Sequence, residues 1–208
     1  MTGLTAYAGL LKVAEFKEGD VVFVSGGAAG AVGSMVGQIA KAMGASKVIG
    51  SAGSPEKVAR LLELGFDAAF NYNDAPVLDQ LKEAAGGSAA LTSTSITSAA
   101  STSKQHLPRS RLAAASQCAV RLPSTTPRSP PVAPRNLAVA IGKQLTLRGF
   151  LVGGQRQHAP RVRAEDGRLA GRWSVSYDET IVDGLENAPQ AFMDLLDGAN
   201  TGKMLVRL

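Results

Sequence analysis

Three glycines, Gly27, Gly30 and Gly33, follow one another at intervals of three residues between an apolar run and an amphipathic run. Glycines at this spacing permit a tight turn and let a pyrophosphate approach the backbone closely. A helix that begins at such a turn offers free N–H groups and a partial positive charge to the anion. A glycine triplet can equally serve as a packing turn, so the neighbouring elements decide between the two interpretations.

The residues on either side predict a strand before the turn and a helix after it. Residues 21–25, VVFVS, form the continuous β-branched run typical of a strand buried on both faces. Residues 32–43 repeat apolar side chains on one helical face. The alternation continues, because the pattern predicts strands over 47–52 and 67–72 and helices over 4–16, 55–64 and 77–85. This order predicts an α/β fold, a Rossmann-type doubly wound parallel sheet, in which the turn is a dinucleotide site.

The alternation is interrupted twice in the second half of the chain. A segment rich in Ser, Thr and Ala covers about 87–133, and an arginine-rich segment covers about 155–174. Neither has a sustained apolar period, so we expect both to be irregular. The intact-looking parts are 1–86, 134–154 and 175–208, with a short helix from Asn136, a strand over 146–152, a helix over 188–196 and a closing strand over 203–208. We expect one domain over 1–208.

The end of the second predicted strand indicates which dinucleotide is bound. Enzymes that use NAD usually place Asp or Glu about 20 residues after the turn to hold the ribose 2′-OH. This chain has Ser51, Ala52, Gly53 and Ser54 there, followed by Lys57. In the first turn of a helix a lysine opposes the macrodipole at a cost of about 0.3–1 kcal/mol, which a bound 2′-phosphate would reverse. NADP is therefore favoured over NAD, and a solvated surface lysine is the alternative.

Several longer stretches resemble one family of oxidoreductases. These are GLTAY, AAGAVGSMVGQIAK, GSAGSPEKV, LGFDAAFNY, LENAPQAFMDLL and NTGKMLVRL. Together they resemble the zinc-independent medium-chain dehydrogenase/reductases, and within them the NADPH-dependent prostaglandin and 2-alkenal reductases. The resemblance implies NADP(H) and hydride transfer to the C=C bond of an α,β-unsaturated carbonyl. To the three glycines, Ser51 and Lys57 it adds cofactor contacts from Ala31, Val32, Ser34, Tyr72, Phe150, Leu151, Val152 and Asn200, with Phe150 to Val152 lining the nicotinamide pocket.

The chain also departs from the family pattern. The family carries a GroES-like domain before GLTAY, so we expect this chain to lack it and to be the cofactor domain of a truncated enzyme. The family's fourth strand, with a cofactor asparagine, and the loop with its substrate-activating tyrosine are not visible either. We therefore assign no catalytic residue and expect impaired turnover. A non-catalytic nucleotide-binding fragment is the alternative.

The two anomalous segments can be interpreted at the level of codons. Joining the last base of each codon to the first two of the next permits D-V-Y-F-D-N-V-G-G from Leu91 and R-V-A-V-C-G-A from Ala114, which are like the missing motifs. In the other shifted frame, 161–173 permits the amphipathic E-F-V-R-K-M-A-G-W-L-A-D-G. The hypothesis is compensated frameshifts, in the gene or in its recorded sequence, and a genuine low-complexity linker is the alternative. Resequencing codons 85–175 separates the two.

Composition excludes other classes of protein. The net charge of +5 resides in the two anomalous segments, which carry +5 and +3 and leave −3 for the rest, and no aromatic residues interleave with the basic ones. We therefore expect no nucleic-acid partner, and no membrane segment, because no apolar run is long enough. Cys118, the single cysteine, cannot form an internal disulfide, which favours a cytoplasmic location. We expect no metal site, and pairing of strand 146–152 between two copies would give a homodimer.

Overall fold

The computed structural model describes residues 2–25, 27–86, 93–96, 113–116, 141, 146–148, 150, 152–153 and 175–208. Its first part alternates helices and strands as predicted. The elements are α1 (Thr2–Tyr7), η1 (Ala8–Val13), β1 (Val21–Ser25), α2 (Gly33–Ala42), β2 (Lys47–Ala52), α3 (Pro55–Glu63), β3 (Ala68–Asn71) and α4 (Val77–Ala84). Three short strands complete the sheet, namely β4 (Ser93–Ile96), β5 (Ala113–Ser116) and β6 (Thr146–Arg148).

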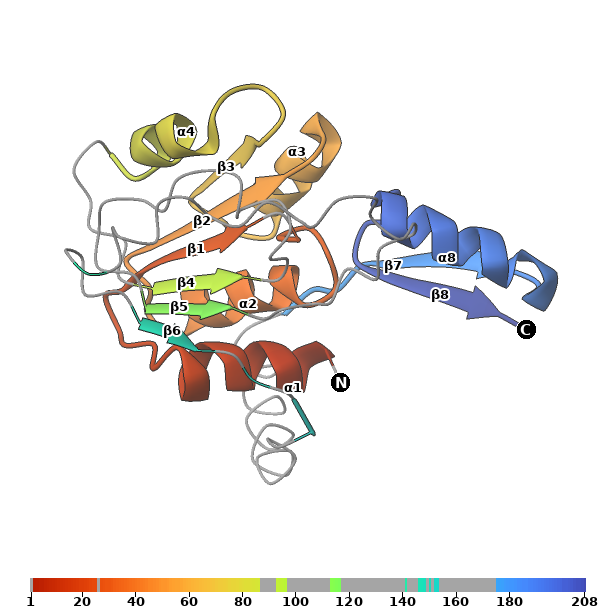
Figure 1. Ribbon diagram of the computed structural model, residues 1–208, viewed down its shortest axis with the longest axis horizontal. Helices are drawn as coiled ribbons and strands as arrows, with labels where there is room; N and C mark the ends of the chain where they lie inside the picture. The colour runs from red at the N-terminus through yellow and green to blue at the C-terminus, as the bar shows by residue number, and fades with distance from the viewer. Residues whose placement is uncertain are drawn as a thin grey trace.

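The six strands form one parallel sheet in the order β3-β2-β1-β4-β5-β6 (Figure 1). This is the strand order of the dinucleotide-binding fold, so the predicted α/β class and doubly wound sheet are confirmed. The chain leaves β1 for β2 on one side and later returns to pair β4 on the other side of β1. Ligands of such sheets bind at this switch point, beyond the carboxyl ends of the strands.

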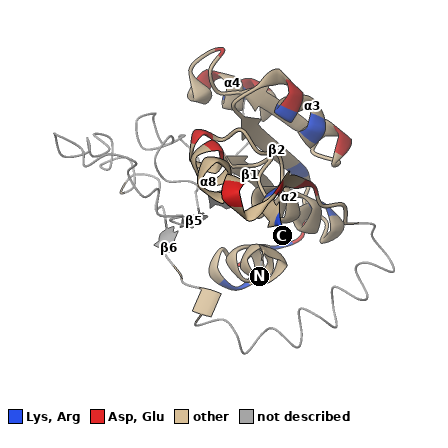
Figure 2. Cartoon of the chain, turned by 90° about the vertical axis from the view of Figure 1, so that its right-hand side faces the viewer, with Lys and Arg blue, Asp and Glu red and all other residues tan. Residues whose placement is uncertain are grey.

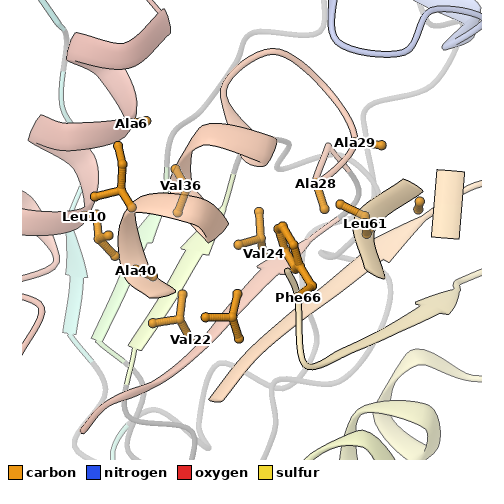
Figure 3. Packing of buried hydrophobic residues seen from close by; sticks show 13 residues of the cluster. Ala6, Leu10, Val22, Val24, Ala28, Ala29, Val36, Ala40, Leu61 and Phe66 are labelled. Carbon is orange, nitrogen blue, oxygen red and sulfur yellow. The ribbon is translucent and has the colours of Figure 1, made fainter. Parts of the chain in front are cut away.

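Apolar packing on both faces holds the sheet between helices. In β1 successive side chains alternate, so Val22 and Val24 join a cluster with Leu10 of η1 and Val36 of α2 (Figure 3). Phe23 points to the other face and packs with residues of β2, β3 and α4. The start of α2, and with it the predicted turn, is therefore anchored to a core on a central strand.

The expectation of an irregular segment over 87–133 is wrong at two places. β4 pairs with β1 from Val22↔Ser93 to Ser25↔Ile96, and β5 pairs with β4. Backbone N–H and C=O groups along the open side of β1 need partners, and any residue except proline can supply both. The positions of β4 and β5 are therefore set by backbone pairing, and the apolar pattern of a sequence does not predict such pairing. The other residues of 87–133, and all of 155–174, lie outside the described residues.

Other boundaries differ from the predictions in detail. The N-terminal helix continues from α1 as the π-helical η1 and ends at Val13, three residues before the predicted end at Phe16. Of the strand predicted over 146–152, the structure shows β6 over 146–148, while Phe150 lies outside any strand and residues 152–153 form a 3₁₀ turn. Of the predicted helix from Asn136, only Ile141 is described, and it is helical.

A second, two-stranded parallel sheet lies in the C-terminal unit, by which we mean residues 175–208. It contains β7 (Glu179–Asp183), η3 (Leu185–Asn187), α8 (Ala188–Asp197) and β8 (Lys203–Arg207). The helix and closing strand were predicted, whereas β7 was missed because ETIVD alternates only weakly. The unit lies beside the six-stranded sheet in Figure 1 and contacts it through a parallel bridge between Gly30 and Gly202. No helix in the described part of the chain is long and apolar enough to cross a membrane.

Candidate functional site

The chain passes from β1 to α2 through the predicted glycine turn. Gly30 N donates to Gly27 O at 2.9 Å. A Cβ added at Gly33 would lie 2.2 Å from Gly27 O and 2.7 Å from the Ala28 Cα, and one at Gly30 would lie 3.1 Å from Gly27 O. These neighbours are backbone atoms, so no side-chain rotation could make room. The turn therefore lies directly against the first residue of the helix, as a pyrophosphate-binding turn requires.

The N-terminal end of α2 presents backbone groups without a capping side chain. Val32 is the N-cap and makes no side-chain cap hydrogen bond. Both the amide and the hydroxyl of the buried Ser34 donate to Gly30 O, at 3.0 and 2.9 Å. Ser34 thus fastens the helix to the turn, and Ala31 and Val32 are half-buried within the turn. An anion at this point would meet amide groups and the positive end of the helix dipole.

The end of β2 places Ser51, Gly53 and Tyr72 together. Ser51 is buried, and its strand ends one residue later. A Cβ added at Gly53 would lie 2.4 Å from the Tyr72 Oη, so the tyrosine side chain covers Gly53. Tyr72 N also donates to Ala52 O at 3.1 Å. The N-cap predicted at Ser54 is confirmed, because its side chain accepts from Lys57 N at 3.4 Å.

Lys57 lies in the first turn of α3 and is partly buried. Its Nζ donates to Gly198 O at the C-terminal end of α8. That helix has no basic residue in its last turn, and Figure 2 shows acidic residues on α8 and charges of both signs on α3. Burial lowers the pKa of Lys57 below its ordinary value. Lys57 is therefore not a fully solvated lysine in this structure, since its ammonium group contacts the C-terminal end of another helix, and its role toward a 2′-phosphate stays a prediction.

Asn200 lies beside the glycine turn through the backbone of Gly202. The Asn200 Nδ2 donates to Gly202 O at 2.7 Å, and Gly202 N donates to Ala29 O at 2.9 Å. Gly202 has φ +67°, and a Cβ there would lie 2.0 Å from Asp178 O. Only glycine fits this position, which brings Asn200, predicted far along the chain, to the same end of β1 as the turn.

Of the three residues predicted to line a nicotinamide pocket, the structure describes Phe150 and Val152. Phe150 packs against Val13 and Ala14, and a Cβ added at Gly9 would lie 3.0 Å from the Phe150 Cζ. Val152 is half-buried, and Leu151 lies outside the described residues. Phe150 is therefore a packing residue of the N-terminal helices, and these contacts do not place it at the glycine turn.

Sequence reasoning missed the residues that dock the C-terminal unit. The Gln38 amide of α2 donates to Ser176 O and accepts from Ser176 N, both at 2.8 Å. Arg60 of α3 binds the Asp178 carboxylate through two nitrogen–oxygen contacts of 2.8 Å each. Arg60 lies one turn after Lys57 on the same helix, but no local signal marks it, because Asp178 lies 118 positions along the chain.

The described residues give no sign of a metal centre. Among them, no three or more His, Cys, Asp or Glu side chains gather where they could hold a metal ion. Absence of a zinc site from the whole protein stays a prediction, because neither histidine nor Cys118 lies in the described ranges.

Comparison with known proteins gives consistent matches over the whole chain. Bovine (Bos taurus) prostaglandin reductase 1 is 41% identical over 223 residues, covering 100% of this chain and 62% of that protein. The NADPH-dependent curcumin reductase of Escherichia coli is 33% identical over 215 residues, covering 100% and 61%. The chain thus spans about three fifths of the length of these relatives.

Solved structures and a family model agree with these relatives. The crystal structure of CurA from Vibrio vulnificus in complex with NADPH superposes with a TM-score of 0.82 at 31% identity, covering 100% of this chain and 62% of that one. Escherichia coli quinone oxidoreductase complexed with NADPH, at 23% identity and a TM-score of 0.77, shares the fold. Residues 31–164 match the family model described as zinc-binding dehydrogenase. The chain therefore belongs to this dehydrogenase family, which confirms the resemblance to the medium-chain dehydrogenase/reductases.

Proposed function

We propose that residues 1–208 form the NADP(H)-binding part of an oxidoreductase of the prostaglandin and curcumin reductase type. The observation that carries the proposal is the close packing of Gly33 on the backbone of the turn, at the end of β1 where the strand order reverses. Two of the proteins named above at 30% identity or more support the choice of cofactor, since the curcumin reductase is described as NADPH-dependent and CurA is bound to NADPH.

The residues of the turn and of α3 fit the two charged parts of NADP(H). The pyrophosphate would lie on the turn 27–34, where glycines leave room for it and the amides of α2 face it. The 2′-phosphate would lie at Lys57 and Tyr72, next to residues 51–54, which include no carboxylate to repel it. An ammonium group has three donors, so Lys57 can bind a phosphate oxygen beside Gly198 O. On the resemblance alone, we assign Phe150 to Val152 to the nicotinamide side and Asn200 to the NADP(H) contacts.

We propose an α,β-unsaturated carbonyl as the substrate class. The cofactor, when bound, supplies a hydride for the C=C bond of such a compound. Within this chain we assign binding and orientation of the nucleotide and no catalytic side chain, and we expect turnover to be impaired. We further propose that the protein needs no zinc, lies in the cytoplasm, and forms a homodimer through strand β6.

A non-catalytic nucleotide-binding fragment is the second candidate, since residues 87–133 do not show the family's cofactor asparagine or its substrate-activating tyrosine. Titration of the 208-residue protein with NADPH, followed by cofactor fluorescence, tests the binding that both candidates require. A parallel assay of enone consumption separates them. Binding with turnover supports the oxidoreductase, binding without turnover supports the fragment, and absence of binding overturns both.

Strand positions support the frameshift proposal for the anomalous segment 87–133. β4 spans Ser93–Ile96, where the shifted frame permits Y-F-D-N, the stretch that the resemblance assigns to the fourth strand. β5 spans Ala113–Ser116 and overlaps the shifted R-V-A-V-C-G-A, which begins at Ala114. We therefore propose that both strands occupy the positions of family strands whose side chains have been replaced.

Replacing Lys57 is expected to remove the preference for NADPH over NADH. Lys57→Ala loses a charged hydrogen bond to the 2′-phosphate, a contribution of about 1.5–3 kcal/mol, or roughly 10- to 150-fold in affinity. Binding of NADH, which has no 2′-phosphate, should change little. Fluorescence titration with both nucleotides measures the ratio, and Lys82→Ala, an exposed lysine of α4, is the matched control. Equal losses for the two nucleotides would show that Lys57 acts only on the fold.

The affinity for NADPH is expected to depend on pH through Lys57. Burial lowers the pKa of this lysine, so its charge is lost at a lower pH than in an exposed lysine. The phosphate is already doubly charged above about pH 7, so NADPH affinity should fall as pH rises through the lowered pKa, while NADH affinity stays level. Folding responds with the opposite sign, since the cost of burying the ammonium disappears over the same rise. Nucleotide titrations between neutral and alkaline pH measure the affinities, and urea unfolding over the same pH range measures the stability.

A further inference from the structure

Helix α3 holds two separate partners with two basic residues one turn apart. Lys57, in its first turn, lies at the proposed 2′-phosphate position, and Arg60 binds the Asp178 carboxylate of the C-terminal unit. Arg60 also contacts Glu63 within its own helix at 2.8 Å. The contact with Asp178 is a planar fork, with Nε on Oδ2 and Nη2 on Oδ1, a geometry that fixes orientation as well as distance.

Asp178 in turn holds the stretch that reaches the glycine turn. Its carbonyl oxygen accepts from Lys203 N at 2.8 Å, and Gly202 lies so close to it that a Cβ would come within 2.0 Å of that oxygen. Gly202 then pairs with the turn through Gly202 N and Ala29 O. A continuous set of contacts thus leads from Arg60 through Asp178 and Gly202 to Asn200.

A second contact, made by Gln38, also holds the C-terminal unit against the six-stranded sheet. The Gln38 amide binds both backbone groups of Ser176, two residues before Asp178. Two helices of the nucleotide-binding sheet therefore hold residues 176–178, α2 through a neutral amide and α3 through a charged fork. Side chains of Arg60 and Asp178 are 31% and 25% exposed, so the pair is partly shielded from water and can be replaced without emptying the core.

We propose that Arg60 is a positioning residue of the nucleotide site, which acts through Asp178 to hold Gly202 and Asn200 against the glycine turn. This inference rests on the proposed NADP(H) binding. Helix α3 thereby contributes to the site twice. Lys57 would contact the nucleotide, and Arg60 holds the segment with Asn200 and Gly202 through Asp178.

Nucleotide affinity and hydrogen exchange test the inference on the full 208-residue chain. Arg60→Ala should weaken NADPH binding roughly 2- to 30-fold, the range for mutations that act through an intermediate contact. Arg60→Lys keeps the charge but loses the fork, so its affinity should be intermediate. The charge exchange Arg60→Asp with Asp178→Arg should restore binding. The matched control is Arg207→Ala, which removes an ion pair with Asp183 inside the C-terminal unit and should leave NADPH affinity unchanged.

Hydrogen exchange gives a readout that needs no nucleotide. The amides of Gly202 and Lys203 donate to Ala29 O and Asp178 O, and in Arg60→Ala they should exchange faster while those of β1 and β2 do not. Unchanged exchange at these two amides overturns the inference, and so does an equal acceleration throughout the sheet, which would mark a purely structural role. Failure of the unaltered protein to bind NADPH overturns the proposed function. In that case hydrogen exchange of the Gly202 amide in Arg60→Ala still tests whether Arg60 positions this segment.

Discussion

Gly33→Ala is expected to abolish nucleotide binding at ordinary concentrations, with a loss of affinity on the order of 100-fold. Two effects of the added methyl group have opposite signs. Alanine favours a helix over glycine by up to about 1 kcal/mol, yet its Cβ would lie 2.2 Å from Gly27 O and 2.8 Å from the Gly27 carbonyl carbon. Because these atoms are backbone, either the turn or the helix must shift, and overpacking of this kind costs about 1–3 kcal/mol. The clash therefore outweighs the helical preference.

Fluorescence titration with NADPH measures the loss, and thermal unfolding measures the accompanying loss of stability. Gly86→Ala is the control, because Gly86 has φ +83° with open space around it, far from the turn at the end of α4. That variant should be destabilised by strain in the backbone and still bind NADPH. Unchanged NADPH affinity in Gly33→Ala would mean that the turn is a packing feature without a pyrophosphate.

Phe66→Ala is expected to lower the free energy of unfolding by about 3–5 kcal/mol, the usual cost of removing a buried aromatic ring. Phe66 is 4% exposed, and its ring fills the space left by two glycines. A Cβ at Gly37 of α2 would lie 2.0 Å from the Phe66 Cζ, and one at Gly50 of β2 would lie 2.9 Å from the Phe66 Cδ1. Since a domain is stable by about 5–15 kcal/mol in total, the loss would consume much of the stability.

A double-mutant cycle makes this prediction specific to the packing of the ring. Gly37→Ala alone should be destabilising because its methyl group meets the ring, and in the Phe66→Ala background that penalty should vanish, giving a coupling of about 0.5–3 kcal/mol. Urea unfolding of the four proteins measures the cycle. Phe192→Ala, at a residue of α8 that is 50% exposed, should cost about 0.5 kcal/mol or less. Additive effects at Gly37 and Phe66 would contradict the contact.

The elements of residues 20–86 could be predicted from the sequence because their local signals agree with their tertiary roles. The run VVFVS is apolar because β1 is covered on both faces, and the stripe of α2 is apolar because it lies on that strand. Ser54 and Pro55 predict the start of α3, because N-capping depends only on neighbouring residues. The glycine turn and Lys57 could be identified for the same reason, since both lie next to such elements.

The features that could not be predicted from the sequence are contacts between residues distant along the chain. β4 has no apolar pattern of its own, and its place is defined by the backbone of β1 about 70 residues earlier. The forked contact of Arg60 joins residues 118 positions apart, and Lys57 meets Gly198 at a separation of 141. Phe150 was assigned to a cofactor pocket by resemblance, whereas its contacts lie with Val13 and Ala14 of the N-terminal segment.

The strand order has a consequence for how the chain folds. β1, β2 and β3 are joined by crossovers within one contiguous stretch, whereas the other half of the sheet begins at β4, which pairs with β1 across about 70 residues of chain. Loop closure costs more entropy as loops lengthen, and long-range parallel pairing is slow. We therefore expect residues 20–86 to order first and to present the open side of β1 as the template on which the other half of the sheet is added.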